Sequence, residues 1–326
     1  MGKLLFNAIS NYKIKIDYYE FSSQSEQRFF ERSGKKLTEI SFSSVDFFHD
    51  IATCGMPWHY INQSCDMKRF EEIKYKLYLM RAALEIDNEG YIIVSDNIKY
   101  LDSSERAFIS YYIGMFMTKL ISRDIFGYDY LVHLGIVERY KKVIRGSQEP
   151  DLVGFKRKKD KYILFEAKGR QFVKSAMIDK AKDQLQSVSY ISGIKPDFGV
   201  VSVAHPIKKE GNRVICSMYD PPLDKNVKQQ VYRVHHEELL YLYYLPIYKM
   251  IREKGNGETY CNFSFYEDGE HEIKIKMEMP KKLFDLFTEN PNFSEWNDNN
   301  FQIRKTISSL PENEKGDLLK IEIDES

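Results

Sequence analysis

The chain of 326 residues has few cysteines, no excess of basic over acidic residues and no long apolar run. Its four cysteines are widely separated and form no CxxC pair, which argues against a zinc knuckle or a dense disulfide framework and indicates buried, reduced thiols. Lysine plus arginine equals aspartate plus glutamate at 48 each, so any nucleic-acid binding must use local patches. Because no apolar run of about 18 residues occurs and the start of the chain lacks a small-residue cleavage site, we expect a cytoplasmic protein without a membrane span.

The composition is that of a folded protein, with 43% hydrophobic and 29% charged residues. A chain of this length can hold one large domain or a core with additions. We expect a core at residues 101–250, an N-terminal accessory region at 1–100 in which no chemistry is evident, and a C-terminal accessory region at 251–326 that contains a β-hairpin.

The segment from residue 103 to 205 predicts a helix, two strands, a helix and a strand in turn. Ser103 and Ser104 suit the start of a helix, and apolar residues follow at helical spacing. Strands are predicted at 151–155 and 161–168, around a charged turn, and then a helix at 175–193 that is closed by Gly193 and a strand at 197–205. This order predicts an α/β fold.

Outside that segment the patterns are simpler. We expect helices at 67–86 and at 235–251, the second interrupted near Pro246. We also expect a strand at 91–101 and a hairpin at 260–279 that turns at Asp268 and Gly269.

The chemistry is concentrated in the stretch QEPDLVGFKRKKDKYILFEAKGR. Side chains alternate between the faces of a strand, so Glu166 and Lys168 share one face and Ala167 lies on the other. If the two strands pair as a hairpin, Asp151 reaches the same surface. Two carboxylates and a lysine then converge at a sheet edge and form a usable site for a divalent cation.

Magnesium is the cation that suits these residues. It prefers oxygen ligands and binds through one or two carboxylates together with water and substrate phosphate. Asp151 and Glu166 would supply the carboxylate oxygens, and the carbonyl of Ala167 would be a third ligand. Lys168 would orient the attacking water or neutralise developing charge, and the alternative for Glu166 and Lys168 is a plain surface ion pair.

This pattern resembles the PD-(D/E)xK nuclease superfamily. The resemblance implies a restriction-endonuclease-like core, a mixed central sheet flanked by helices. Gln186 and Tyr190 in KDQLQSVSY resemble the Q-x-x-x-Y helix of the RecB-like branch, which places a glutamine and a tyrosine beside the metal, and Gln184 is an alternative to Gln186. The family often takes a third acid from a preceding helix. Glu105 resembles that residue, although a glutamate in the first turn is equally explained by the helix dipole, and Glu138 is a further candidate.

The resemblance implies a nuclease that hydrolyses DNA phosphodiesters with Mg²⁺ or Mn²⁺, in a prokaryotic phage-defence or mobile-element system. The alternative is a non-catalytic subunit that binds nucleic acid or scaffolds a complex, and RNA cleavage, partner proteins and a homo-oligomer all stay open. Arg170 and Lys174 are placed to touch a scissile strand, whereas KRKKDK is either a phosphate-binding groove or a solvated hairpin tip. We interpret His133, His235 and His236 as ordinary hydrogen-bonded histidines, because no third ligand lies at a zinc spacing.

Overall fold

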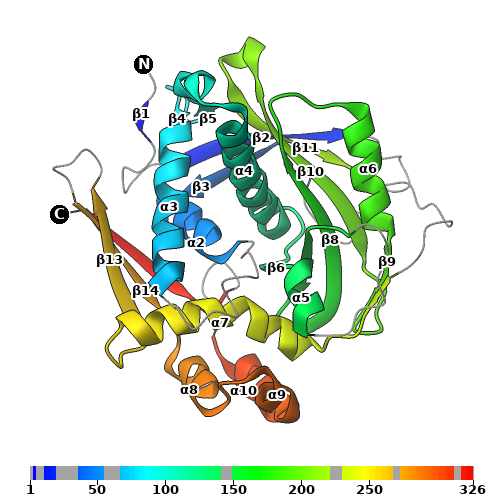
Figure 1. Ribbon diagram of the computed structural model, residues 1–326, viewed down its shortest axis with the longest axis vertical. Helices are drawn as coiled ribbons and strands as arrows, with labels where there is room; N and C mark the ends of the chain where they lie inside the picture. The colour runs from blue at the N-terminus through cyan, green and yellow to red at the C-terminus, as the bar shows by residue number, and fades with distance from the viewer. Residues whose placement is uncertain are drawn as a thin grey trace.

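A computed structural model describes residues 3–4, 11–19, 36–54, 67–140, 149–220, 230–266, 272–311 and 317–325. A mixed sheet of ten strands runs through its centre in the order β1-β4-β5-β11-β10-β8-β7-β6, with β2 paired to β11 and β3 paired to β2 (Figure 1). The strands are β1 (Lys3–Leu4), β2 (Asn11–Tyr19), β3 (Glu39–Ser43), β4 (Leu84–Ile86), β5 (Ile92–Val94), β6 (Tyr130–His133), β7 (Leu152–Lys156), β8 (Lys159–Gly169), β10 (Phe198–Ile207) and β11 (Arg213–Tyr219). The expected α/β class is confirmed, and the sheet takes strands from residues 1–100 as well as from the predicted core.

Two long helices cover opposite faces of the sheet centre. Helix α4 (Ser103–Asp124) packs on β8 at Gly169, and α6 (Ser175–Gln186) packs on β10 at Gly199. Gly199 is in register with Leu164 of β8. Because Leu164 and Gly169 are an odd number of residues apart on one strand, they face opposite sides of the sheet. Glu166 and Lys168 therefore share the α6 face, and Ala167 shares the α4 face.

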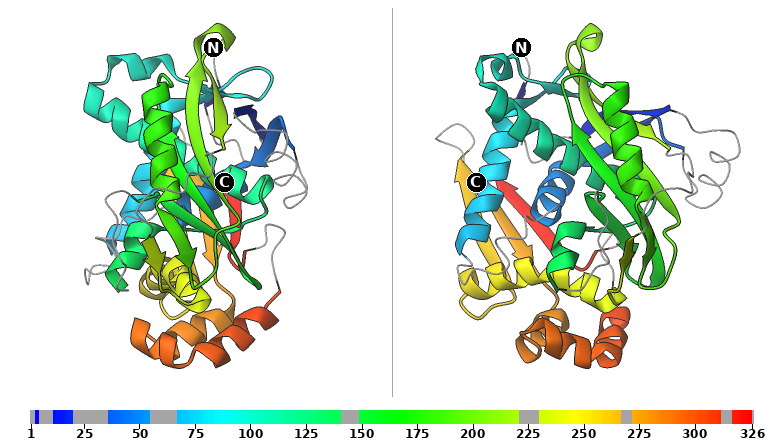
Figure 2. Two further views of the ribbon diagram at one scale, coloured as in Figure 1. Left: turned by 90° about the vertical axis from the view of Figure 1, so that its right-hand side faces the viewer. Right: turned by 45° about the vertical axis from the view of Figure 1, so that its right-hand side comes forward.

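The remaining elements surround this core. They are α2 (Ser44–Thr53), α3 (Met67–Ala83), the 3₁₀ helix η2 (Asp96–Tyr100), α5 (Leu134–Tyr140), the 3₁₀ helix η3 (Lys208–Glu210) and α7 (His236–Lys254), and a two-stranded sheet of β9 (Val188–Ile191) and β12 (Gln230–Tyr232). A three-stranded sheet of β13 (Tyr260–Tyr266), β14 (Glu272–Glu278) and β15 (Lys320–Glu325) lies at one end of α7, and α8 (Lys281–Glu289), α9 (Phe293–Asp298) and α10 (Asn300–Ser309) lie beneath α7 (Figures 1 and 2).

A buried polar cluster joins the C-terminal segment to the rest of the molecule. Asp317 is 0% exposed and accepts hydrogen bonds from the hydroxyls of Tyr243 and Tyr244, each at 2.5 Å. The ring of His49 on α2 lies between Asp317 and Asp50, at 2.9 Å and 3.0 Å. Burial alone would lower the pKa of His49, but its hydrogen bonds to the two carboxylates and their charges raise this pKa above its usual value. The cluster therefore holds three elements that are distant in the sequence.

Several expected elements are confirmed and others are wrong. The predicted helix from Ser103, the hairpin β7–β8 and the strand β10 are confirmed. Cys54, Cys216 and Cys261 are buried free thiols, and Cys65 lies outside the described residues. The expected interruption near Pro246 is wrong, because α7 continues through it with nearly every side chain buried, and packing outweighs the local cost. The strand expected at 91–101 ends at Val94, since the Ser95 hydroxyl accepts from Asn97 N and starts η2. The hairpin β13–β14 is confirmed, and its predicted turn at Asp268 and Gly269 lies outside the described residues.

Candidate metal centre

Asp151, Glu166 and Lys168 come together where β7 begins beside β8. The antiparallel register pairs Leu152 with Phe165, so Asp151 lies opposite Glu166 just before β7 starts. Past this point β8 continues to Gly169 without β7 as its neighbour. The Asp151 carboxylate takes the place of that neighbour, because its Oδ2 accepts a hydrogen bond from the Ala167 N–H at 3.0 Å.

The three charged side chains contact one another directly. Glu166 Oε2 accepts a hydrogen bond from the Asp151 N–H at 2.9 Å. The ammonium of Lys168 donates to Glu166 Oε1 and lies 3.5 Å from Asp151 Oδ2. The predicted convergence of the two carboxylates and the lysine at a sheet edge is thus confirmed in geometry.

Burial makes Glu166 the unusual acid of the cluster. Its side chain is 0% exposed, and this burial, with a smaller contribution from the charge of Asp151, raises its pKa to about 7, while Lys168 opposes the rise. Asp151 and Lys168 are 22% and 18% exposed, so the cluster is open to solvent on their side. A cation that binds beside Glu166 would favour the ionised form of this carboxyl group.

The donor set fits a hard divalent cation that completes its shell with water and phosphate. Asp151 and Glu166 supply carboxylate oxygens at one point. The carbonyl and N–H of a strand residue point to the same side, so the Ala167 carbonyl also faces Asp151. Among the residues that the structure describes, no group of three or more His, Cys, Asp or Glu side chains is placed to hold a metal ion.

Two glycines set the distance between α4 and the strand that carries Glu166 and Lys168. A Cβ atom at Gly114 would lie 2.5 Å from Gly169 N and 2.7 Å from the carbonyl carbon of Lys168. A Cβ atom at Gly169 would lie 1.5 Å from the carbonyl oxygen of Ser110. This close packing of α4 on β8 fixes the position of the Lys168 backbone.

The charge of Asp151 affects the pKa of two further residues: His133, which we interpreted as an ordinary hydrogen-bonded histidine, and Tyr111, which the sequence did not indicate. Burial lowers the pKa of His133, and the charge of Asp151 opposes this effect. His133 also pairs with Leu152 across β6 and β7, and its Nδ1 accepts from Gly135 N at 3.2 Å. Burial raises the pKa of Tyr111 on α4, with a smaller contribution from Asp151. No zinc-type spacing marks either residue, because they approach Asp151 from separate elements.

The prediction that Gln186 and Tyr190 lie one turn apart on a helix is wrong. Helix α6 ends at Gln186, and Tyr190 lies on β9, where it is 45% exposed and pairs with Val231 of β12. A strand partner from a distant segment ends the helix earlier than the local pattern indicates. Gln184, the alternative, donates from Nε2 to the carbonyl of Glu149 at 2.8 Å and so holds the segment that leads to Asp151.

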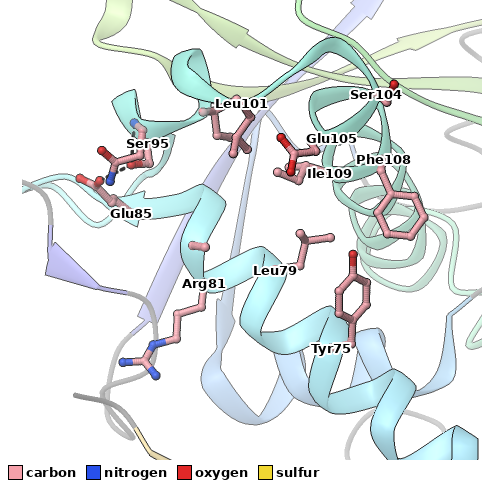
Figure 3. Close-up of a pocket in the computed structure, with 13 residues that line it drawn as sticks. Tyr75, Leu79, Arg81, Glu85, Ser95, Leu101, Ser104, Glu105, Phe108 and Ile109 are labelled. Atoms are coloured by element: carbon pink, nitrogen blue, oxygen red, sulfur yellow. Dashed lines mark hydrogen bonds between the residues drawn. The ribbon is translucent and has the colours of Figure 1, made fainter. Parts of the chain in front are cut away.

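Glu105 and Glu138 occupy other places in the molecule. Glu105 closes a capping box with Asp102 at the start of α4, nine residues before Gly114, a helical rise of about 13 Å. Figure 3 shows its carboxylate pointing toward α3. Glu138 accepts a hydrogen bond from the Tyr232 hydroxyl at 3.2 Å. We therefore leave both out of the proposed metal centre.

The basic residues divide into two groups. At the hairpin tip, Lys158, Lys159 and Lys161 are exposed, as a solvated tip predicts. Arg157 is buried there and donates to the carbonyl of Leu310 at 2.9 Å. Past the end of β8, Arg170 and Lys174 are exposed. Phe172 between them is 61% exposed, and the Lys208 ammonium lies 5.3 Å from its ring. This second group is the basic surface that follows directly from Lys168.

The histidine pair is structural, as expected. His236 is buried and its Nε2 donates to the carbonyl of Arg157 at 2.9 Å, which ties α7 to the hairpin turn between β7 and β8. The backbone N–H of His235 donates to Glu238 at 2.6 Å at the start of α7.

Comparisons of the chain with protein-family models, curated proteins and solved structures found no match. Among the described helices, none combines the length and the apolar character that a membrane crossing requires.

Proposed function

We propose that the chain is a divalent-metal-dependent nuclease that hydrolyses DNA phosphodiester bonds. The observation that carries the proposal is the direct contact of Asp151, Glu166 and Lys168 at the end of the β7–β8 pairing. The flanking order of helix, antiparallel strands, helix and parallel strand supports a restriction-endonuclease-like core. The proposal rests on this geometry and on the resemblance of PD…EAK to the PD-(D/E)xK superfamily.

Each residue has a definite task in this proposal. A bound Mg²⁺ or Mn²⁺ would acidify a coordinated water and offset charge on the phosphate. Asp151 and Glu166 hold the cation, and Asp151 also fixes the Ala167 backbone through its second hydrogen bond. Lys168 lies between both carboxylates, where its ammonium can orient the attacking water and counter the charge that develops on phosphate oxygens.

The basic surface supports a nucleic-acid substrate. Arg170 and Lys174 follow Lys168 within six residues, a chain length of about 20 Å at full extension. Their charges would attract the phosphate backbone although the whole chain is neutral. The exposed ring of Phe172 between them offers a surface on which an unpaired base can stack.

The test is cleavage of supercoiled plasmid, linear duplex and single-stranded DNA with Mg²⁺ or Mn²⁺. We expect Lys168→Ala, Asp151→Asn and Glu166→Gln each to lower the rate by about a hundredfold or more. Lys161→Ala is the matched control, because Lys161 lies on the same strand and is 50% exposed. Cleavage that persists in all three variants would contradict the proposal.

A non-catalytic subunit is the second candidate. It is favoured by the neutral net charge and by the hydrogen bonds that both carboxylates already accept inside the protein. Calorimetry with Mn²⁺ separates the two functions. Binding that is lost in Asp151→Asn supports the nuclease, and DNA binding without any metal binding supports the subunit.

A further inference from the structure

A cavity of about 680 Å³ lies between α3, η2 and α4, away from the proposed metal centre (Figure 3). Its volume is within the range of small-molecule sites, about 300 to 1,000 Å³. Glu105 borders this cavity from the N-terminal end of α4. The proposed nuclease chemistry makes no use of it.

The walls of the cavity are mainly apolar and its rim is aromatic. Leu79, Ile98, Leu101 and Ile109 line it from the three elements. Tyr75 and Phe108, also in the lining, are 49% and 43% exposed, and their ring centroids lie 5.9 Å apart.

Exposed aromatic residues concentrate in this part of the molecule. Of the eight large hydrophobic side chains that are exposed in the described residues, four belong to α3, η2 and α4: Tyr75, Tyr78, Tyr100 and Phe108. Tyr75 and Phe108 line the cavity itself, and exposed apolar side chains at a concave pocket are a feature of ligand-binding sites.

Two of the three charged residues that line the cavity are acidic. Glu105 lines the cavity from an exposed position, and its Oε2 accepts the Asp102 N–H at 3.0 Å. Glu85 lies at the other end and accepts the Ser95 hydroxyl at 2.6 Å. Arg81 also borders the cavity, but Figure 3 shows its side chain extending away from Glu105 and Phe108.

We propose that this cavity binds an organic cation with an apolar body, such as an aryl or alkyl ammonium compound. The cationic head would lie beside the Glu105 carboxylate and against the rings of Phe108 and Tyr75, which attract cations through their electron-rich faces. The apolar body would contact Leu79, Ile98 and Ile109. A carboxylate or phosphate ligand is disfavoured, because Glu85 and Glu105 would repel it.

The test uses the full chain without metal or nucleic acid, so its result is independent of nuclease activity. Benzyltrimethylammonium is titrated and followed by saturation-transfer NMR, and neopentylbenzene, of the same shape without charge, is the comparison ligand. We expect Glu105→Gln to weaken binding of the cation about threefold to fivefold and Phe108→Leu to weaken it by up to about tenfold. Glutamine preserves the capping box, so α4 should stay intact.

The outcomes are distinct. Saturable binding that weakens in Glu105→Gln and Phe108→Leu, but not in the exposed control Glu253→Gln, supports the proposal. Absence of binding would overturn it. If neopentylbenzene binds as tightly as the cation, charge does not select the ligand, and the proposal is overturned. If both cavity variants bind the cation as tightly as the wild type does, the ligand does not bind in this cavity, and the proposal is likewise overturned. Circular dichroism of each variant verifies that α4 is folded.

Discussion

Substitution of Gly114 by alanine tests the contact on which the proposed metal centre depends. In an exposed helix position, replacing glycine with alanine stabilises by about 1 kcal/mol. Here the new Cβ would lie 2.5 Å from Gly169 N and 2.7 Å from the carbonyl carbon of Lys168, and both are backbone atoms that cannot rotate away. Relief to an ordinary contact of 3.4 Å requires a separation of about 0.9 Å between α4 and β8.

Overpacking of this kind costs about 1 to 3 kcal/mol. We therefore expect Gly114→Ala to lower the free energy of unfolding by up to about 2 kcal/mol, once the gain of about 1 kcal/mol from the helix propensity of alanine is subtracted. For a chain of 326 residues the melting temperature should fall by up to about 3 °C. A displacement near 1 Å at Lys168 should also slow cleavage by up to about a hundredfold.

Urea denaturation and thermal melting measure the stability, and plasmid cleavage measures the activity. Ala107→Gly, at an exposed position of the same helix, calibrates helix propensity and should cost about 1 kcal/mol. The sign of the change in the free energy of unfolding tests whether α4 and β8 are in close contact. If Gly114→Ala raises the free energy of unfolding, as it would on an open helix surface, the close approach of α4 to β8 is wrong.

Three further predictions follow from the site and the core. The pKa of Glu166 is raised from 4.5 to about 7, so the folded protein retains a proton that the unfolded chain loses. The free energy of unfolding in EDTA should therefore fall by up to about 3 kcal/mol between pH 4.5 and 7. Urea denaturation across this range should show no such fall in Glu166→Gln. Asp317→Ala should lower the free energy of unfolding by about 3 to 5 kcal/mol, because it leaves a buried imidazolium at His49 with one carboxylate partner fewer. The raised pKa of His49 stabilises the wild type below about pH 6.5, and this stabilisation is lost as pH rises through the pKa of the folded state. If Asp317→Ala keeps the pH dependence of the melting temperature unchanged, the pairing of His49 with Asp317 is not its cause. Tyr190→Phe should leave the cleavage rate within about twofold of wild type, because Tyr190 lies on β9. A fall in the cleavage rate as large as that of Lys168→Ala would show that Tyr190 does act in the catalytic site.

The local pattern was sufficient for the central hairpin and for the three residues it carries. Alternation along 161–168 placed Glu166 and Lys168 on one face, and the short charged turn paired that strand with the one after Asp151. These features depend on neighbours close in the sequence, so they could be predicted without knowledge of distant contacts.

Distant contacts explain the errors. The Q-x-x-x-Y pattern indicated a continuous helix, but β12 supplies a strand partner for residues 188–191 and removes Tyr190 from the helix. The helix through Pro246 persists because its side chains are buried on almost every side. Local propensity is a weak guide wherever a distant segment offers hydrogen bonds or packing.

The sequence by itself determined the α/β class, the hairpin and the identity of its charged residues, because strand periodicity and turn composition are local properties. Only the tertiary structure decided which of the candidate acids meet. Asp151 reaches Glu166 because it precedes β7 at the point where β8 continues without that neighbour. Glu105 instead lines a separate cavity, because α4 carries it about 13 Å from the glycine contact. The burial that raises the pKa of Glu166 likewise comes from the elements packed around β8, and no stretch of sequence contains that information.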